Sequence, residues 1–301
     1  MIKNVILDVD TGIDDAVAIA LAVYNKRLNV RLITTIAGNL GVRAVTKNTL
    51  NLLQYINKRR IPVAVGEEKP LERKKDNSIQ AHGKRGLGHF QFPPCELKPV
   101  KEKAYVKMYK MIMRAKKKTT IIGLGPLTNI AKMLLTYPDV KKKIDQIIIR
   151  GGLLEDNKRK PYLSFNIMQD PEAARYIMKS GIKILVCPSD LGHTAFLTPE
   201  EVEQTRQTNT TGEMLEYIFR SFKDRHVKVG IATHDSCAML CASHPEIFKR
   251  QKMYVHIRFL QEQQTGVIDF DKKKKPNMKV AVAINKKKFK KIYFEALSKM
   301  P

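Results

Sequence analysis

Tryptophan is absent from this sequence of 301 residues, and cysteine occurs only four times, at positions 95, 187, 237 and 241. No pair of cysteines has a spacing typical of a zinc site. Cys237 and Cys241 are expected to share one face of a helix as small buried hydrophobic residues. This cysteine usage gives no indication of a disulfide-stabilised fold and fits a reducing cytoplasm, the location that we expect.

Long hydrophobic runs are also missing. No apolar stretch approaches the roughly 18 residues that a membrane-spanning helix needs. The chain shows no signal-peptide pattern at its start, because the short apolar run after Lys3 is interrupted at once by Asp8 and Asp10. The sequence therefore predicts no contact with a membrane.

Acidic residues are scarce relative to basic ones. Lys and Arg number 55 against 29 for Asp and Glu, which gives a formal net charge of +26. A nucleic-acid-binding surface is one interpretation. However, the lysine runs are dispersed along the chain, and no arginine-rich stripe or aromatic-interleaved RNA module accompanies them. A lysine-rich solvated surface is the favoured interpretation, and no nucleic-acid partner is predicted.

The order of apolar runs alternates between strand-like and helix-like periodicity from end to end. This alternation, without repeats or a linker, predicts one α/β domain over residues 1–301, with a mostly parallel central sheet flanked by helices and a Rossmann-like core. Segments 67–99 and about 221–234 are predicted to be mobile parts of a functional site. The expected strands are 2–8, 30–36, 62–65, 119–123, 144–150, 184–187, 254–259 and 279–284, and the expected helices are 13–25, 42–57, 101–114, 126–135, 171–180, 199–207, 212–227, one from about 235 and one from 287.

The most informative segment is the run from Asp8 to Asp15, which contains four aspartates. It covers the end of the first predicted strand, a Thr-Gly turn and the first turn of the next helix. Ligands bind at this edge of an open α/β sheet. N-capping and the helix dipole account for two of the aspartates, but not for four clustered charges. A hard cation such as Ca²⁺ or Mg²⁺ would relieve their repulsion.

Four further segments end predicted strands or begin predicted helices. Taken singly, each is compatible with an ordinary turn or helix cap. They are the run ending in Asn39, the Gly123–Asn129 segment, the segment from Ser164 through Asn166 to Asp170-Pro171, and Thr233-His234-Asp235.

Together these segments resemble the inosine–uridine preferring nucleoside hydrolases along the whole chain. The aspartate run is specific to that family, and the matches extend to His82-Gly83 with Gly86-Leu87 and to the Asp269-Phe-Asp segment. The resemblance implies hydrolysis of the N-glycosidic bond of ribonucleosides, a role in purine or pyrimidine salvage, and a homo-oligomer, dimeric or tetrameric. It leaves the preferred base open.

The resemblance also implies a role for each matching residue. Ca²⁺ would be held by Asp10, Asp15, Asp235 and the backbone carbonyl of Leu124, and Asp10 would also activate the attacking water. His234 would assist the departing base. The residues implied to contact the nucleoside are Asp14, Asn39, His82, Asn166 and the position of Ser164.

One region departs from the family pattern. Ser164 stands where members usually carry a glutamate, and Lys158 stands where they carry an asparagine. Because both missing groups serve the ribose hydroxyls toward the 5′ end, the sequence predicts weak hydrolysis of ordinary ribonucleosides. A sugar altered at C5′, including an anionic one that contacts Lys158 or Lys160, is a hypothesis.

Two alternatives remain at this point. The Asp8-Val-Asp10-Thr opening also fits the haloacid-dehalogenase-type phosphatases, in which Asp8 would be the nucleophile and Mg²⁺ the metal. Alternatively, the chain is a degenerate nucleoside hydrolase that binds a metal and ribosides without turnover, and Ser164 is the main support for that reading.

Overall fold

The computed structural model describes residues 2–72, 86–88, 90–154, 164–220, 230–260 and 265–301. Over these residues the chain forms a nine-stranded sheet in the order β3-β2-β1-β4-β5-β6-β9-β7-β8. The neighbours from β3 to β9 in this order are parallel, and β7 is antiparallel to both β9 and β8. This confirms the predicted α/β fold with a mostly parallel sheet flanked by helices.

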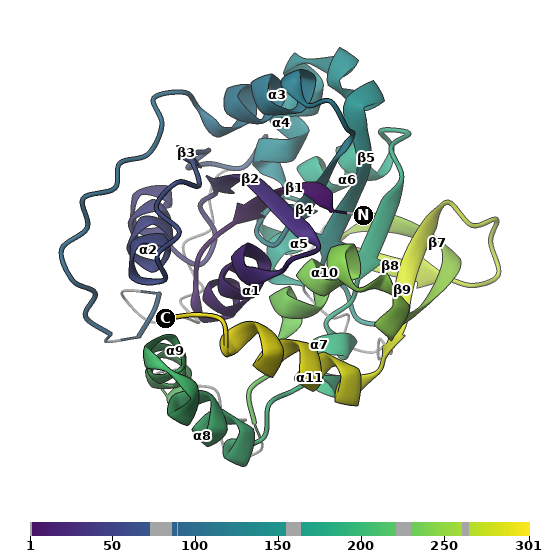
Figure 1. Ribbon diagram of the computed structural model, residues 1–301. Helices are drawn as coiled ribbons and strands as arrows, with labels where there is room; N and C mark the ends of the chain where they lie inside the picture. The colour runs from purple at the N-terminus through teal and green to yellow at the C-terminus, as the bar shows by residue number, and fades with distance from the viewer. Residues whose placement is uncertain (1, 73–85, 89, 155–163, 221–229, 261–264) are drawn as a thin grey trace.

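The nine strands span β1 Lys3–Val9, β2 Leu28–Thr35, β3 Val63–Val65, β4 Thr119–Gly123, β5 Ile144–Arg150, β6 Ile184–Cys187, β7 Phe248–Leu260, β8 Thr265–Asp271 and β9 Met278–Ile284 in the part of the chain that is described. The helices span α1 Ile13–Tyr24, α2 Val42–Tyr55, α3 Ala104–Arg114, α4 Thr128–Thr136, α5 Phe165–Gln169, α6 Pro171–Met178, α7 Asp190–Thr194, α8 Pro199–Thr208, α9 Thr210–Arg220, α10 His234–Ser243 and α11 Lys286–Leu297, with short 3₁₀ turns at Pro138–Lys143 and Pro245–Ile247. In Figure 1, β3 and α2 lie at one edge of the molecule and β7 and β8 lie at the other.

Alternating side chains of the central strands build two separate cores, one on each face of the sheet. Val5 and Leu7 of β1 belong to the core covered by α1, α2, α10 and α11, whereas Ile6 belongs to the core covered by α3, α4 and α6. This follows from the two-residue period of a strand. Because both faces are covered, the central strands read as continuous apolar runs.

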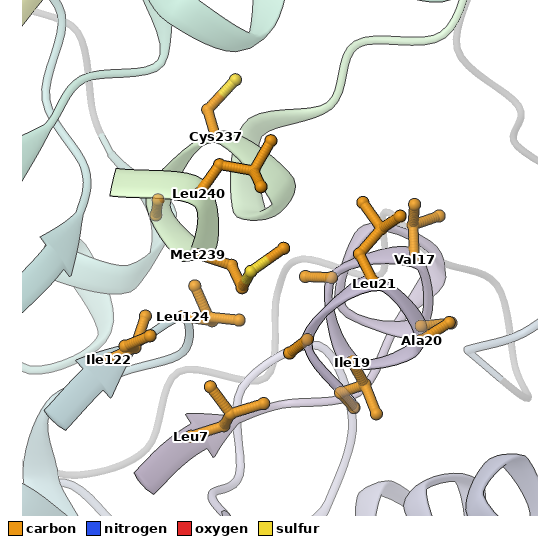
Figure 2. Packing of buried hydrophobic residues seen from close by; sticks show 14 of the residues in the cluster. Leu7, Val17, Ile19, Ala20, Leu21, Ile122, Leu124, Cys237, Met239 and Leu240 are labelled. Carbon is orange, nitrogen blue, oxygen red and sulfur yellow. The ribbon is translucent and has the colours of Figure 1, made fainter. Parts of the chain in front are cut away.

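The core beneath the strand ends is formed by α1 and α10. Figure 2 shows Met239 of α10 extending toward α1, and Leu21 of α1, Leu7 of β1 and Leu124, which follows β4, belong to the same cluster. All four side chains are almost completely buried. This packing fixes the first turns of α1 and α10 beside the carboxyl ends of β1 and β4.

Several elements differ from the sequence-based expectation. The strand β8 and the short helices α5 and α7 were not predicted, and β7 begins at Phe248 rather than at Tyr254. The first half of β7 carries the exposed, mostly charged run Lys249-Arg250-Gln251-Lys252 and therefore lacks the apolar residues that mark a strand in the sequence. Its backbone nevertheless pairs with β9.

Parts of the two segments predicted to be mobile, 67–99 and 221–234, lie outside the described residues, so their mobility stays a prediction. Among the described helices, none combines the length and the apolar character needed to cross a membrane.

Candidate active site

The candidate site lies where the strand order reverses direction. From β1 the sheet grows through β2 to β3, and from β4 it grows the other way through β5 and β6. The carboxyl ends of two strands that diverge in this way leave a crevice, which is the usual ligand position in an open α/β sheet. Asp10 follows β1, Leu124 follows β4, and Arg150 ends β5.

Asp10 is held between two glycines from neighbouring loops. A Cβ atom at Gly38 would lie 2.2 Å from Asp10 Oδ2, and one at Gly125 would lie 2.9 Å from Asp10 Oδ1. The backbone N–H of Asn39 donates to Asp10 Oδ2 at 2.8 Å, and the Asn39 side-chain amide donates to the Asp10 carbonyl at 3.2 Å. The carboxylate of Asp10 therefore has a fixed orientation and only 2% exposure for the residue.

Asp14 and Asp15 occupy the first turn of α1. Asp15 Oδ2 accepts from the backbone N–H of Gly12 at 3.0 Å, which satisfies the donor of the N-cap residue of α1. Its other oxygen, Oδ1, is buried and has no hydrogen-bond partner in the described part of the chain. Burial raises the pKa of Asp14 to about 7 and the pKa of Asp15 to about 6.

The fourth member of this cluster comes from the other end of the sequence. Asp235 lies in the first turn of α10, and its backbone N–H donates to Asp14 Oδ2 at 3.4 Å. Burial, followed by the charges of Asp14 and Asp15, raises the pKa of Asp235 well above its ordinary value. Burial and the charge of Asp15 do the same for Asp10. The buried carboxylates of Asp10, Asp15 and Asp235 and the partly buried one of Asp14 therefore lie close together, and positive charge would stabilise their ionised forms.

Part of that positive charge comes from Arg150, a residue that the sequence analysis did not single out. Its Nε lies 3.2 Å from Asp235 Oδ1, and its Nη2 lies 3.9 Å from Asp14 Oδ2. The charge of Arg150 lowers the pKa of Asp10, Asp14, Asp15 and Asp235 against the larger effect of burial. The available signal was a cation at the end of the apolar run Ile147-Ile148-Ile149.

The donor set matches a hard divalent cation. Carboxylate and carbonyl oxygens are the ligands that Ca²⁺ and Mg²⁺ prefer, and the free Oδ1 of Asp15 is the kind of buried oxygen that a cation would satisfy. The Leu124 carbonyl accepts from the Asn166 side-chain amide, which leaves it a second lone pair. Nevertheless, no three His, Cys, Asp or Glu side chains in the described ranges converge closely enough to hold a metal as they stand.

His234 adjoins the carboxylate cluster at the start of α10. Its Nδ1 donates to the Ser189 carbonyl at 3.0 Å, and its ring meets that of His193 edge to face at 4.7 Å. Burial, then the charges of Arg150 and His193, lowers the pKa of His234 well below its ordinary value. With Nδ1 committed to a carbonyl, Nε2 is the nitrogen left for a ligand.

Two predicted substrate-binding residues, Ser164 and Asn166, lie at the start of α5. Asn166 is in α5 and is buried beside Leu124, as its hydrogen bond shows. Ser164 immediately precedes α5, is completely buried, and its hydroxyl has no hydrogen-bond partner in the described part of the chain. His82, Lys158 and Lys160 lie outside the described residues.

Asp8, the first aspartate of the run, belongs to a separate network. Its Oδ1 accepts from Thr34 at 2.6 Å and from Asn129 at 2.8 Å, and the residue has no exposed surface. Burial raises the pKa of Asp8 to about 7. These bonds tie β1 to β2 and α4, so Asp8 supports the site from within the protein.

Comparison with known proteins agrees with this geometry. The family model described as inosine-uridine preferring nucleoside hydrolase matches residues 5–291. The chain belongs to this family. As a nucleoside hydrolase it is an enzyme that acts on N-glycosyl bonds, which excludes the phosphatase alternative.

Relatives of this nucleoside hydrolase match it over nearly their whole length. The non-specific ribonucleoside hydrolase RihC of Escherichia fergusonii is 36% identical over 299 residues, which cover 98% of each chain. A solved plant nucleoside hydrolase, PpNRh1, has 29% identity and a TM-score of 0.89 over 99% of both chains. The purine-preferring ribonucleoside hydrolase from Gardnerella vaginalis, at 24% identity, shares the fold with a TM-score of 0.88 over 98% of both chains.

Proposed function

We propose that this nucleoside hydrolase cleaves ribonucleosides to free base and ribose, with Ca²⁺ held by Asp10, Asp15, Asp235 and the Leu124 carbonyl. The observation that carries this proposal is the clustering of four aspartates, three of them buried, where the strand order reverses. The activity named for the RihC relatives supports the same reaction.

The reaction passes through a ribose with cationic character, which negative charge stabilises. When bound, the divalent cation would acidify water and hold the sugar hydroxyls. Asp10 is the residue that takes the proton from the attacking water, because Asn39 and the two glycines fix its carboxylate in one orientation.

The sugar is oriented by the remaining polar side chains. Asp14, Asn39 and Asn166 surround Asp10 and Leu124 and can accept from or donate to hydroxyl groups. Holding the ribose in one pose converts attack by water into a nearly intramolecular event. Ser164, which precedes α5, offers the sugar a single hydroxyl, which supports weaker recognition of the ribose than a carboxylate would give.

His234 donates a proton to the departing base. Because Nδ1 donates to the Ser189 carbonyl, transfer takes place at Nε2. A lowered pKa makes the protonated imidazole a stronger acid, although a smaller fraction of the enzyme carries the proton at neutral pH.

Base release from a panel of nucleosides tests the proposal. Purified enzyme is incubated with inosine, uridine and adenosine, with a chelator and again after Ca²⁺ is restored. Free base should appear, disappear on chelation and return with Ca²⁺. Full activity in the presence of a chelator would refute the metal requirement, and turnover of none of the substrates would leave the degenerate-member alternative.

That alternative proposes binding of metal and ribosides with little turnover. The replacement at Ser164 and the cation of Arg150 among the carboxylates support it. It predicts binding of inosine, measured by calorimetry, without base release. A salvage role, a cytoplasmic location and a dimer or tetramer are further proposals that follow from the family.

A further inference from the structure

Arg150 contacts two carboxylates of the cluster, and one of them, Asp235, is a proposed metal ligand. It ends β5, where it pairs in register with Cys187 of β6, and its side chain is 16% exposed. Its guanidinium reaches Asp235 and Asp14, which come from the first turns of α10 and α1. The arginine therefore bridges the two helices whose ends form the site.

The charge of Arg150 cannot be removed by pH. A guanidinium stays protonated in proteins. Two charges that come out of water must be paired, and removal of one partner leaves the other uncompensated. Asp235, at 3% exposure, therefore needs a nearby cation to stay ionised, whether that cation is Arg150 or a metal.

A divalent cation on Asp235 would compete with this ion pair. The oxygen of Asp235 that lies 3.2 Å from Arg150 Nε, Oδ1, is the oxygen of that side chain with no conventional hydrogen bond. In the described residues no three acidic side chains lie close enough together to hold a metal as they stand. Electrostatic repulsion between the cation and the guanidinium adds to the competition.

We propose that Arg150 is a resident counter-cation that competes with the divalent metal for Asp235 and Asp14. It keeps the carboxylate cluster ordered when the metal is absent and weakens metal binding when the metal is present. This inference rests on the proposed metal site. Arg150 is therefore a positioning residue for the ligands, and binding of the metal requires Asp235 to exchange one cation for another.

Calcium titration of metal-stripped enzyme tests the exchange. Isothermal calorimetry compares the wild type with Arg150→Gln, which removes the charge, and Arg150→Lys, which keeps it. Arg258→Gln is the control, because Arg258 forms an exposed ion pair with Asp269 on β8 and neither residue is a proposed metal ligand. We expect Arg150→Gln to bind Ca²⁺ at least ~10-fold more tightly, which corresponds to about 1.4 kcal/mol, while Arg150→Lys and Arg258→Gln stay within about twofold of the wild type.

Thermal melting provides a second readout that a purely structural arginine would not produce. Metal-free Arg150→Gln should melt below the wild type, and saturating Ca²⁺ should close the gap. A general packing defect would lower both melting temperatures equally. If Arg150→Gln unfolds without metal, its refolding on addition of Ca²⁺, followed by circular dichroism, supports the proposal, and failure to refold overturns it.

The outcomes separate this inference from the proposed function. Tighter binding by Arg150→Gln supports it, including the case in which only the variant binds. Equal or weaker binding by the variant, with Ca²⁺ bound by the wild type, overturns the role of Arg150 and leaves the metal site intact. Absence of binding to both proteins overturns the proposed calcium site and the inference together.

Discussion

At the scale of single residues, Asp10 has the most constrained environment in the site. Gly38, Gly125 and Asn39 hold its carboxylate from three sides. Asparagine in its place keeps the shape and loses the basic oxygen. Asp10→Asn should therefore lower turnover of inosine by about 10²–10⁴-fold, even at Ca²⁺ concentrations that restore occupancy. Asp139→Asn, at an exposed position, is the control. Near-normal turnover by Asp10→Asn would rule out its role as base.

Replacement of His234 should mainly slow the cleavage of substrates whose leaving group must be protonated. His234→Ala should slow cleavage of inosine far more than cleavage of p-nitrophenyl riboside, whose leaving group needs no proton. Because the pKa of His234 is lowered well below its ordinary value, its protonated form accumulates only at pH values well below 6.5. The ratio of kcat/KM for inosine to that for p-nitrophenyl riboside should therefore rise as the pH falls.

Protonation of the proposed metal ligands lowers kcat/KM for both substrates alike, so its effect cancels in this ratio. In His234→Ala the ratio should be independent of pH. Equal losses on both substrates, or a pH-dependent ratio in the variant, would indicate that His234 only supports the start of α10.

Ser164 has a buried hydroxyl that no described residue satisfies. If the ribose 5′-hydroxyl is its partner, Ser164→Ala should lower kcat/KM for inosine by about 10-fold, since a hydrogen bond is worth about 1 kcal/mol or somewhat more. The loss with 5′-deoxyinosine should be negligible. Equal losses on both substrates would contradict this partner. Ser164→Glu should increase activity when the 5′-hydroxyl is present, provided that the protein accommodates a larger side chain beside Gly151.

At the scale of elements, Asp170 links three segments of the chain by hydrogen bonds. Asp170 caps α6 by accepting from the Ala173 backbone at 3.0 Å. It also accepts from the Leu71 backbone at 2.8 Å and from Thr128 of α4 at 2.6 Å. The segment after β3 and the first turns of α4 and α6 therefore share one carboxylate.

Removal of this carboxylate should cost more than the loss of an ordinary helix cap. Asp170→Ala should lower the free energy of unfolding by about 3 kcal/mol, since it leaves buried donors unsatisfied. The control is Asn285→Ala at the exposed cap of α11, where the side chain accepts only from Lys288 N at 3.0 Å, and about 1 kcal/mol is expected. Denaturant unfolding of both variants gives the comparison, and equal costs would contradict the linking role.

At the scale of the whole molecule, metal binding should stabilise the fold, because α1, α10 and the loop after β4 each contribute a proposed ligand. A ligand at 100 times its Kd stabilises the native state by about 2.7 kcal/mol. Added Ca²⁺ should therefore raise the melting temperature of the wild type by several degrees, and Asp15→Ala should lose most of this rise. Unchanged melting of the wild type with Ca²⁺ would contradict the proposed site.

The net charge of +26 also belongs to this scale. The carboxylate cluster is an acidic site within a strongly basic protein. Short-range pairing, above all with Arg150, rather than the overall charge, therefore sets the electrostatics of the site.

Much of the fold and half of the site could be predicted from the sequence, because both depend on local patterns. Buried parallel strands are continuous apolar runs, and the motif from Asp10 to Asp15 occupies one strand, one turn and one helix start. A strand end and the helix that follows it stay together in any parallel α/β arrangement. The position of these carboxylates at the edge of the sheet was therefore determined by the sequence alone.

Contacts between distant segments were decided by the tertiary structure. Arg150 meets Asp235 only because β4, β5 and β6 are neighbours and α10 packs on α1, and neither relation is contained in a local pattern. The same holds for Asp8, which the register of β1 with β2 places beside Thr34, and for Ser164, which is buried against the Gly151 segment. Long-range register and helix packing convert a run of aspartates into separate roles, because burial and charge pairing depend on which neighbours the fold supplies.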